Sequence, residues 1–164
     1  MSNRLNGFRD PRLAFLFDYW CRKRGGRVAA SRMDLLPSEI KSFLPIMNLI
    51  DVNRDPLKFR HRLVGTEIVD QLGRDVTGAF VSPDLYGDAF PQIFEALRVV
   101  VEEIQPYARR ARISWADRNW LCAESIALPL IDSAGEVNMV LRAASYFTDA
   151  RAVSGDGEVW PLAA

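Results

Sequence analysis

The stretch from residue 59 to residue 78, FRHRLVGTEIVDQLGRDVTG, constrains the fold more than any other part of the chain. Its first part alternates: Phe59, His61 and Leu63 fall on one side of an extended backbone, and the arginines between them fall on the other. After Val64 the period changes from that of a strand to that of a short helix, and glycines stand where helical turns would end. The stretch therefore predicts a strand that runs directly into short helical turns.

Other segments supply the remaining elements of an α+β domain. Five segments have the alternation or the composition of strands: residues 46–52, 57–64, 106–115, 120–131 and 137–147. Between the second and the third of these strands, residues 88–103 carry a broad apolar stripe at helical spacing. The expected order is therefore two strands, helical turns, one long helix and a meander of three strands.

Two motifs in the central stretch, RLVGTEI at residues 62–68 and GRDVTG at residues 73–78, resemble the core of a bacterial family of PAS domains. Weaker similarity on both sides extends the resemblance to about residues 18–147. The resemblance implies a five-stranded antiparallel sheet with helices on one face. It also implies a sensor, although it implies no particular ligand.

The chain is expected to form three regions. Residues 1–45 hold an N-terminal helix and a connector, residues 46–147 form the PAS-like core, and residues 148–164 form a C-terminal tail. The length suits one domain with a single apolar core. We expect a bacterial protein in which this domain stands alone.

The N-terminal helix is amphipathic and rich in aromatic side chains. Asp10 and Pro11 are typical of a helix start, and Gly25 is typical of a helix end. The large side chains of this helix either cover the sheet of the same domain or also form a homodimer seam, as N-terminal helices often do in proteins that resemble this one. The residues expected at that dimer interface are Phe15, Leu16, Tyr19 and Trp20.

Composition argues against several classes of function. Lys and Arg total 21, as do Asp and Glu, so the formal net charge is zero and a nucleic-acid binder driven by overall charge is not expected. The N-terminus lacks the apolar run of a signal peptide, and no apolar run approaches the roughly 18 residues of a membrane span. Cys21 and Cys122 show no metal-site spacing and are most simply reduced thiols. We therefore expect a cytoplasmic protein.

The positions of the histidine and the cysteines suggest no cofactor. Haem-binding PAS proteins usually present their iron ligand from the long helix, and residues 88–103 contain no histidine. Light-sensing relatives carry a reactive cysteine on the helical turns, and residues 65–80 contain no cysteine. Haem and a covalent flavin adduct are therefore not expected, and the identity of any other cofactor stays open.

The sequence contains no glycine-rich phosphate loop, nucleophile elbow or cluster of metal ligands. His61, the only histidine, is expected to be at least half buried, where one satisfied hydrogen bond is the simplest role. We therefore expect no enzymatic activity. The alternatives are a small α+β cavity enzyme that uses His61 with an acidic residue, and an interaction scaffold that binds no ligand.

Glu124 lies in an unusual position for a carboxylate. It shares a face of its expected strand with large apolar side chains, where an unpaired charge is costly. Arg109 or Arg142 on neighbouring strands could supply a partner. Glu124 would then form either a structural ion pair or a polar anchor inside a ligand pocket.

A pocket is expected between the inner face of the sheet and the helical turns, where PAS-like folds hold ligands. Its lining would be mostly apolar, as small-molecule pockets usually are, with polar side chains that orient the ligand and arginines that could neutralise an anion. The expected lining residues are Phe59, His61, Ile68, Leu72, Phe94, Glu124, Ile126 and Leu141, with Arg109 and Arg142 as the arginines. We expect this module to bind a small molecule, a protein signalling partner or both, and to signal through altered dimerisation or partner binding.

Overall fold

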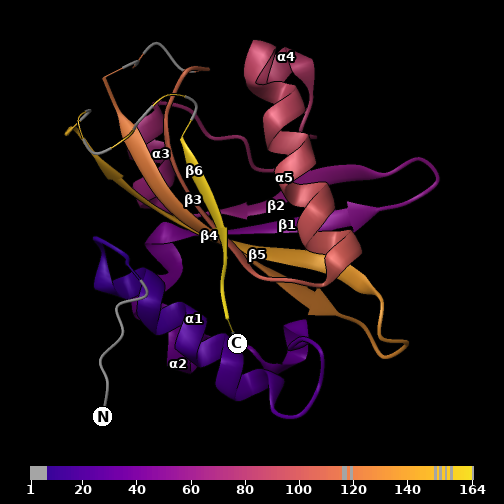
Figure 1. The fold of residues 1–164 in the computed structure, drawn as a ribbon. Helices are drawn as coiled ribbons and strands as arrows, with labels where there is room; N and C mark the ends of the chain where they lie inside the picture. The colour runs from indigo at the N-terminus through magenta and orange to yellow at the C-terminus, as the bar shows by residue number, and fades with distance from the viewer. Residues whose placement is uncertain are drawn as a thin grey trace.

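The computed structural model describes residues 7–115, 118, 120–149, 151, 153, 155 and 157–163. Six strands form one antiparallel sheet in the order β2-β1-β5-β4-β3-β6 (Figure 1). The strands are β1 (Met47–Asn53), β2 (Lys58–Val64), β3 (Tyr107–Arg112), β4 (Cys122–Ile131), β5 (Val137–Phe147) and β6 (Glu158–Pro161). The predicted α+β fold with a PAS-like antiparallel sheet is thus confirmed.

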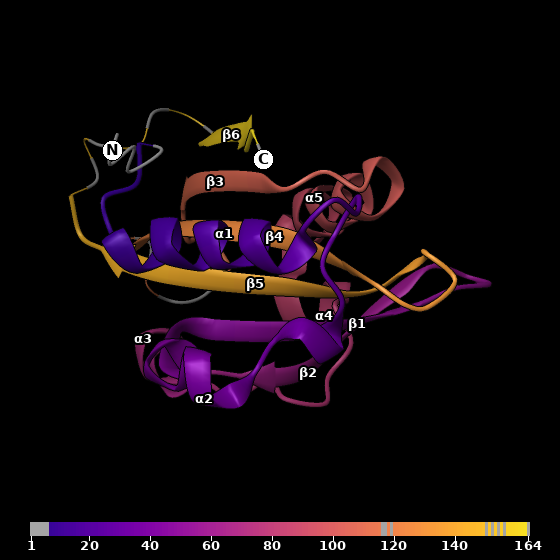
Figure 2. The same ribbon diagram turned by 90° about the horizontal axis from the view of Figure 1, so that it is seen from below.

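The helices lie on both faces of this sheet. Figure 2 shows α1 crossing one face over β4 and β5, while α5 packs against the same two strands from the opposite face. We call the face beneath α5 the inner face and the face beneath α1 the outer face. The helices are α1 (Pro11–Arg24), α2 (Pro37–Ile40), α3 (Thr66–Leu72), α4 (Pro83–Tyr86) and α5 (Phe90–Glu103), with 3-10 turns η1 (Arg32–Asp34), η2 (Lys41–Ile46) and η3 (Gly87–Ala89).

The sixth strand comes from the segment that was expected to be a tail. β6 pairs with β3 from Tyr107 to Arg110, and the amide of Leu162 donates to the carbonyl of Pro106 at 2.9 Å. β3 therefore does not present an open edge over these residues. Parts of the expected regions lie outside the described residues: 1–6 at the N-terminus, 116, 117 and 119 before β4, and 150, 152, 154, 156 and 164 in the C-terminal segment.

Helix α1 begins and ends where its capping residues predict. The side chain of Asp10 accepts a hydrogen bond from the amide of Arg12 at 2.9 Å, and Pro11 occupies the first turn. The buried stripe of the helix packs on the outer face, where the indole nitrogen of Trp20 donates to the carbonyl of Pro129 at 2.9 Å. This contact fixes the helix to β4.

The packing of α1 changes the interpretation of its aromatic face. Leu16, Tyr19 and Trp20, expected at a dimer seam, are buried within the chain itself, because the outer face of the sheet needs an apolar cover. Phe15 remains 43% exposed and stacks on Phe43 with ring centroids 4.7 Å apart. Of the four residues expected at a dimer interface, only Phe15 lies at the surface.

The central stretch forms the junction between β2 and α3. A side chain at Gly65 would not fit, because its Cβ would lie 2.2 Å from the carbonyl oxygen of Pro45. Gly73 ends α3 with a positive φ of 73°, a conformation that glycine adopts at little cost. Gly65 and Gly73 are therefore required by the backbone.

A bulge in β2 alters the expected alternation. Leu63 pairs with Leu49 and His61 pairs with Ile50, so Arg62 is an extra residue in β2. Leu63 is consequently directed to the opposite face from His61, and the expectation that they share a face is wrong. His61 stays on the inner face and is 1% exposed.

Candidate functional site

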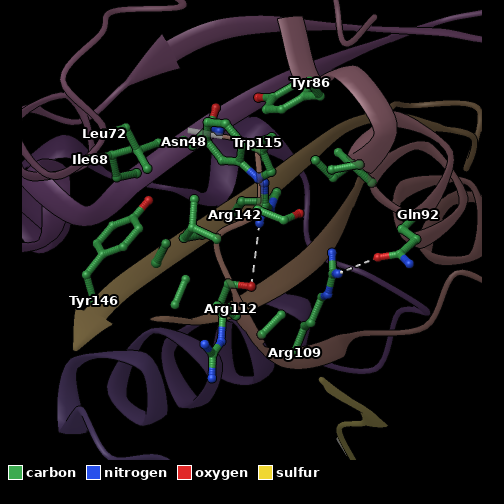
Figure 3. Close-up of a pocket in the computed structure, with 18 of the residues that line it drawn as sticks. Asn48, Ile68, Leu72, Tyr86, Gln92, Arg109, Arg112, Trp115, Arg142 and Tyr146 are labelled. Atoms are coloured by element: carbon green, nitrogen blue, oxygen red, sulfur yellow. Dashed lines mark hydrogen bonds between the residues drawn. The ribbon is translucent and has the colours of Figure 1, made fainter. Parts of the chain in front are cut away.

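The inner face of the sheet carries several small side chains beneath α5. Ala123, Ser125 and Ala127 of β4 and Ala144 of β5 point toward α5, while the large apolar side chains of β4 point toward α1. Small residues beneath a helix leave space that the helix cannot fill. A cavity of about 270 Å³ lies there, bordered by α3 and α5 as well as by the sheet (Figure 3).

Two arginines flank Ser125 on the cavity floor. Arg109 of β3 stands opposite Ser125 in the strand register, and the Nη2 of Arg142 of β5 donates to its Oγ at 3.5 Å. The Nη2 of Arg109 donates to the Oε1 of Gln92 on α5 at 3.3 Å (Figure 3). Both bonds are long, and both acceptors are neutral. Burial lowers the pKa of Arg109, and repulsion by Arg142 lowers it further.

A second cavity of about 390 Å³ lies beneath the middle of α5. It shares Gln92, Arg109, Ser125 and Arg142 with the first cavity, so this polar group separates the two spaces. Val159 of β6 also lines the second cavity. The C-terminal strand therefore contributes to the walls around the arginines.

A hydrogen-bonded chain lies beside the first cavity. The hydroxyl of Tyr86 bonds to the Nε2 of His61 at 2.7 Å, and the Nδ1 of His61 bonds to the Oδ1 of Asn48 at 3.3 Å. Burial lowers the pKa of His61 to about 4, and the positive charges of Arg142 and Arg74 add to this effect. A neutral ring satisfies both bonds if Nδ1 carries the proton and Nε2 accepts from Tyr86.

This environment does not favour the cavity-enzyme alternative. Asn48 and Tyr86 line the cavity, whereas His61 lies behind them and is bonded to no carboxylate of the described residues. A general base with a pKa near 4 is a weak proton acceptor at neutral pH. Within the described ranges, no three His, Cys, Asp or Glu side chains are grouped to hold a metal ion.

Arg74 of the GRDVTG motif lies against two aromatic residues, Tyr86 and Trp115, at the end of the cavity formed by α4. Its guanidinium lies 4.8 Å from the ring centroid of Trp115 and 5.7 Å from that of Tyr86. Its Nη2 donates to the carbonyl of Leu85 at 2.7 Å. Trp115 and Tyr86 line the cavity and meet edge to face, with centroids 4.8 Å apart. Aromatic rings therefore close this end, and the cation of Arg74 lies against them.

The structure places Glu124, Ile126 and Leu141 away from the cavity that they were expected to line. These residues lie on the outer face, beneath α1, because the large apolar side chains of β4 and β5 cover that face. Glu124 is 0% exposed and its Oε2 accepts from the Nη2 of Arg110 at 2.9 Å. The partner of Glu124 is thus Arg110, and neither Arg109 nor Arg142.

The other expected lining residues lie on the inner side. Ile68 and Leu72 of α3 line the first cavity, whereas Phe59 and Phe94 meet edge to face with centroids 5.3 Å apart and pack beyond it. Several lining residues were not anticipated from the sequence: Asn48, Tyr86, Gln92, Trp115, Ser125 and Tyr146. The alternation of small and large residues in β4 was the signal that could have identified the cavity face.

Comparison with known protein families gives one match over most of the chain. A family model described as PAS domain matches residues 9–144. The fold is similar to a sensory box histidine kinase/response regulator from Burkholderia thailandensis E264, with 15% identity, a TM-score of 0.45 and coverage of 71% of this chain and 88% of that chain. It is also similar to a sensory box sensor histidine kinase from Vibrio cholerae, with 12% identity, a TM-score of 0.46 and coverage of 71% of this chain and 91% of that chain. No curated protein matches the sequence.

Proposed function

Because the chain belongs to the PAS domain family, whose members are generally sensory and not enzymatic, we propose that it is a sensory module that binds a small molecule beneath α5. The observation that carries this proposal is the small-residue floor formed by Ala123, Ser125 and Ala144. A sheet face that only supported a helix would carry large apolar side chains, as the outer face of this sheet does. The cavity of about 270 Å³ is near the lower end of small-molecule sites, roughly 300 Å³.

The proposed output is a change in dimerisation or in binding of a protein partner, in the cytoplasm. A ligand changes such an equilibrium only if it binds one state more tightly than the other. The C-terminal strand supplies a physical route for this difference, since Gly157 and Val159 border the second cavity. Phe15, exposed on α1, offers a side chain through which two copies could meet. No helix of the described residues is long and apolar enough to cross a membrane.

Native mass spectrometry of protein isolated without dialysis tests this proposal. We expect wild-type protein to carry a small-molecule adduct, and Ala123→Phe to lose it because the new ring occupies the cavity. Val28→Phe is the matched control: it adds the same ring at an exposed position, where Val28 is 60% exposed, and should retain the adduct.

The competing interpretation is a ligand-free interaction scaffold. It would be favoured if wild-type protein carried no adduct and a fragment screen by nuclear magnetic resonance shifted no amide signal of the cavity floor. An adduct that persisted in Ala123→Phe would place the ligand elsewhere and would also contradict the proposal.

A further inference from the structure

We propose that Arg109 and Arg142 form an anion-binding site, and that the ligand of the cavity is a small organic anion with a carboxylate or phosphate group. Because this site lies inside the proposed ligand cavity, the assignment rests on the proposed function. It goes further by stating the charge and the chemical class of the ligand.

The first support is the absence of compensating charge. Among the described residues that line the first cavity there is no Asp or Glu, although Arg109 and Arg142 both lie there. Glu95, the carboxylate residue on the wall of the second cavity, pairs instead with Arg98 on the exposed side of α5. The two floor arginines form no ion pair with any carboxylate that the structure describes.

Two other partly buried arginines are paired with carboxylates. Arg12 pairs with both Asp10 and Glu67, and Arg110 pairs with Glu124. The long contacts of the floor arginines to Gln92 and Ser125 replace little of the hydration that burial removes. Two neighbouring cations that no described carboxylate compensates are unfavourable for folding, so their presence requires another reason.

A bound anion would supply the negative charge that compensates both arginines. Guanidinium groups bind carboxylate and phosphate oxygens through paired, charge-assisted hydrogen bonds. Arg109 and Arg142 approach from strands on either side of β4, so an anion above Ser125 would contact both (Figure 3). Burial and the positive charge of Arg142 lower the pKa of Arg109, as expected where no anion compensates its charge.

The remainder of the cavity indicates an organic anion. Ile68 and Leu72 of α3, Ile93 of α5 and the ring of Trp115 present apolar surface around the charged floor. An inorganic ion would leave this surface uncovered, whereas an organic acid could place its charged group between the arginines and its apolar body against the helices.

Inorganic phosphate serves as the probe of the charged part of this site. We propose urea unfolding of the full chain at constant ionic strength, with chloride replaced stepwise by phosphate, and in a parallel series by acetate. Arg109→Gln and Arg142→Gln remove one floor cation each. Arg62→Gln removes an exposed arginine of β2 that pairs with Asp51, so it controls for net charge.

Replacing a floor arginine should not lower the stability of the protein, whereas replacing the arginine of a buried structural ion pair should lower it. In chloride alone, Arg109→Gln and Arg142→Gln should have unfolding midpoints at or above the wild-type value, because a repulsion between two half-buried cations is relieved. Wild-type protein and Arg62→Gln should gain stability saturably with phosphate or acetate, since a ligand that binds only the folded state raises its stability. Each floor variant should bind the probe about 10-fold to 100-fold more weakly, the effect of one hydrogen bond to a charged group. The relative response to phosphate and acetate identifies the preferred headgroup.

Two outcomes would overturn the assignment: a loss of stability in chloride when either floor arginine is replaced, or equal anion responses in wild-type protein and both floor variants. These outcomes are separable from failure of the proposed function. If an adduct is present in wild-type protein and absent in Ala123→Phe while the anion responses are equal, the cavity binds a neutral ligand. The proposed function would then stand, and the anion site would not.

Discussion

Arg110 and Glu124 form an ion pair beneath the N-terminal segment, with the guanidinium Nη2 2.9 Å from the carboxylate Oε2. The other carboxylate oxygen, Oε1, accepts from the backbone amide of Arg9 at 2.8 Å. The same Nη2 of Arg110 also donates to the carbonyl of Gly7 at 2.9 Å. This pair therefore joins β3, β4 and the residues before α1, and it gives Glu124 a structural role on the outer face.

The first prediction concerns this pair. Arg110→Gln should lower the free energy of unfolding by about 3–5 kcal/mol, because it leaves a fully buried carboxylate without its cation. Arg62→Gln breaks the exposed pair with Asp51, so it should cost no more than about 1 kcal/mol. Urea unfolding measures the loss of stability in the two variants. Equal losses would mean that Glu124 is not buried and paired as described.

The second prediction concerns the cover that α1 provides. Trp20→Ala should cost about 3–5 kcal/mol, since it removes a fully buried indole from the outer face. Phe15→Ala, five residues earlier in the helix and 43% exposed, should cost about 1 kcal/mol or less. Thermal and urea unfolding compare the two, and a larger loss for Phe15→Ala would reverse the assigned orientation of the helix.

The third prediction ranks two aromatic residues that touch each other. Phe59 is fully buried on β2, whereas Phe94 on α5 is half-buried, although their rings meet 5.3 Å apart. Phe59→Ala should therefore cost about 3–5 kcal/mol and Phe94→Ala clearly less. Their double variant should cost less than the sum of the two, because they share one contact. Strict additivity would show that the contact contributes nothing.

The fourth prediction is a dependence of stability on pH through His61. Its pKa is about 4 in the folded protein and 6.5 in the reference state, so the unfolded chain binds more protons between these values. Stability from this residue should be complete above pH 6.5 and should fall, by about 3 kcal/mol, as the pH drops toward 4. The facing groups are the hydroxyl of Tyr86, the amide of Asn48 and the guanidinium groups of Arg142 and Arg74.

Urea unfolding across this pH range checks the effect in wild-type protein and in His61→Gln, which retains hydrogen-bonding groups for both neighbours. The variant should lose less stability between pH 6.5 and 4 than the wild type does. Parallel pH profiles would contradict the assignment, as would an imidazole signal that titrates near pH 6.5 in nuclear magnetic resonance.

The order of elements could be predicted because the periodicities of strands and helices are local. The cap at Asp10 and the glycine at position 25 predict the two ends of α1, and the apolar stripe predicts the long helix α5. β6 could not be recognised in the same way, because four residues carry too little alternation and its pairing with β3 is a tertiary contact. The bulge at Arg62 is likewise invisible in the sequence, and it changes the faces of Leu63 and Val64.

The placement of the site was harder to predict than the fold. β4 has one face with large side chains around Glu124 and another with Ala123, Ser125 and Ala127. Because small-molecule pockets usually have apolar linings, this pattern predicts the ligand on the large face. In the structure α1 covers the large face, and the cavity forms where the side chains are small. Arg109 and Arg142 were expected near the ligand, and both lie on this small-residue face.

A crystal structure of the full chain, purified without dialysis, would show whether the inner face encloses a ligand cavity with the two floor arginines at its centre. We expect electron density for a small molecule beneath α5, in contact with the guanidinium groups of Arg109 and Arg142. Side chains of α5 packed directly on Ala123 and Ala144, with both arginines paired to carboxylates of the chain itself, would contradict it.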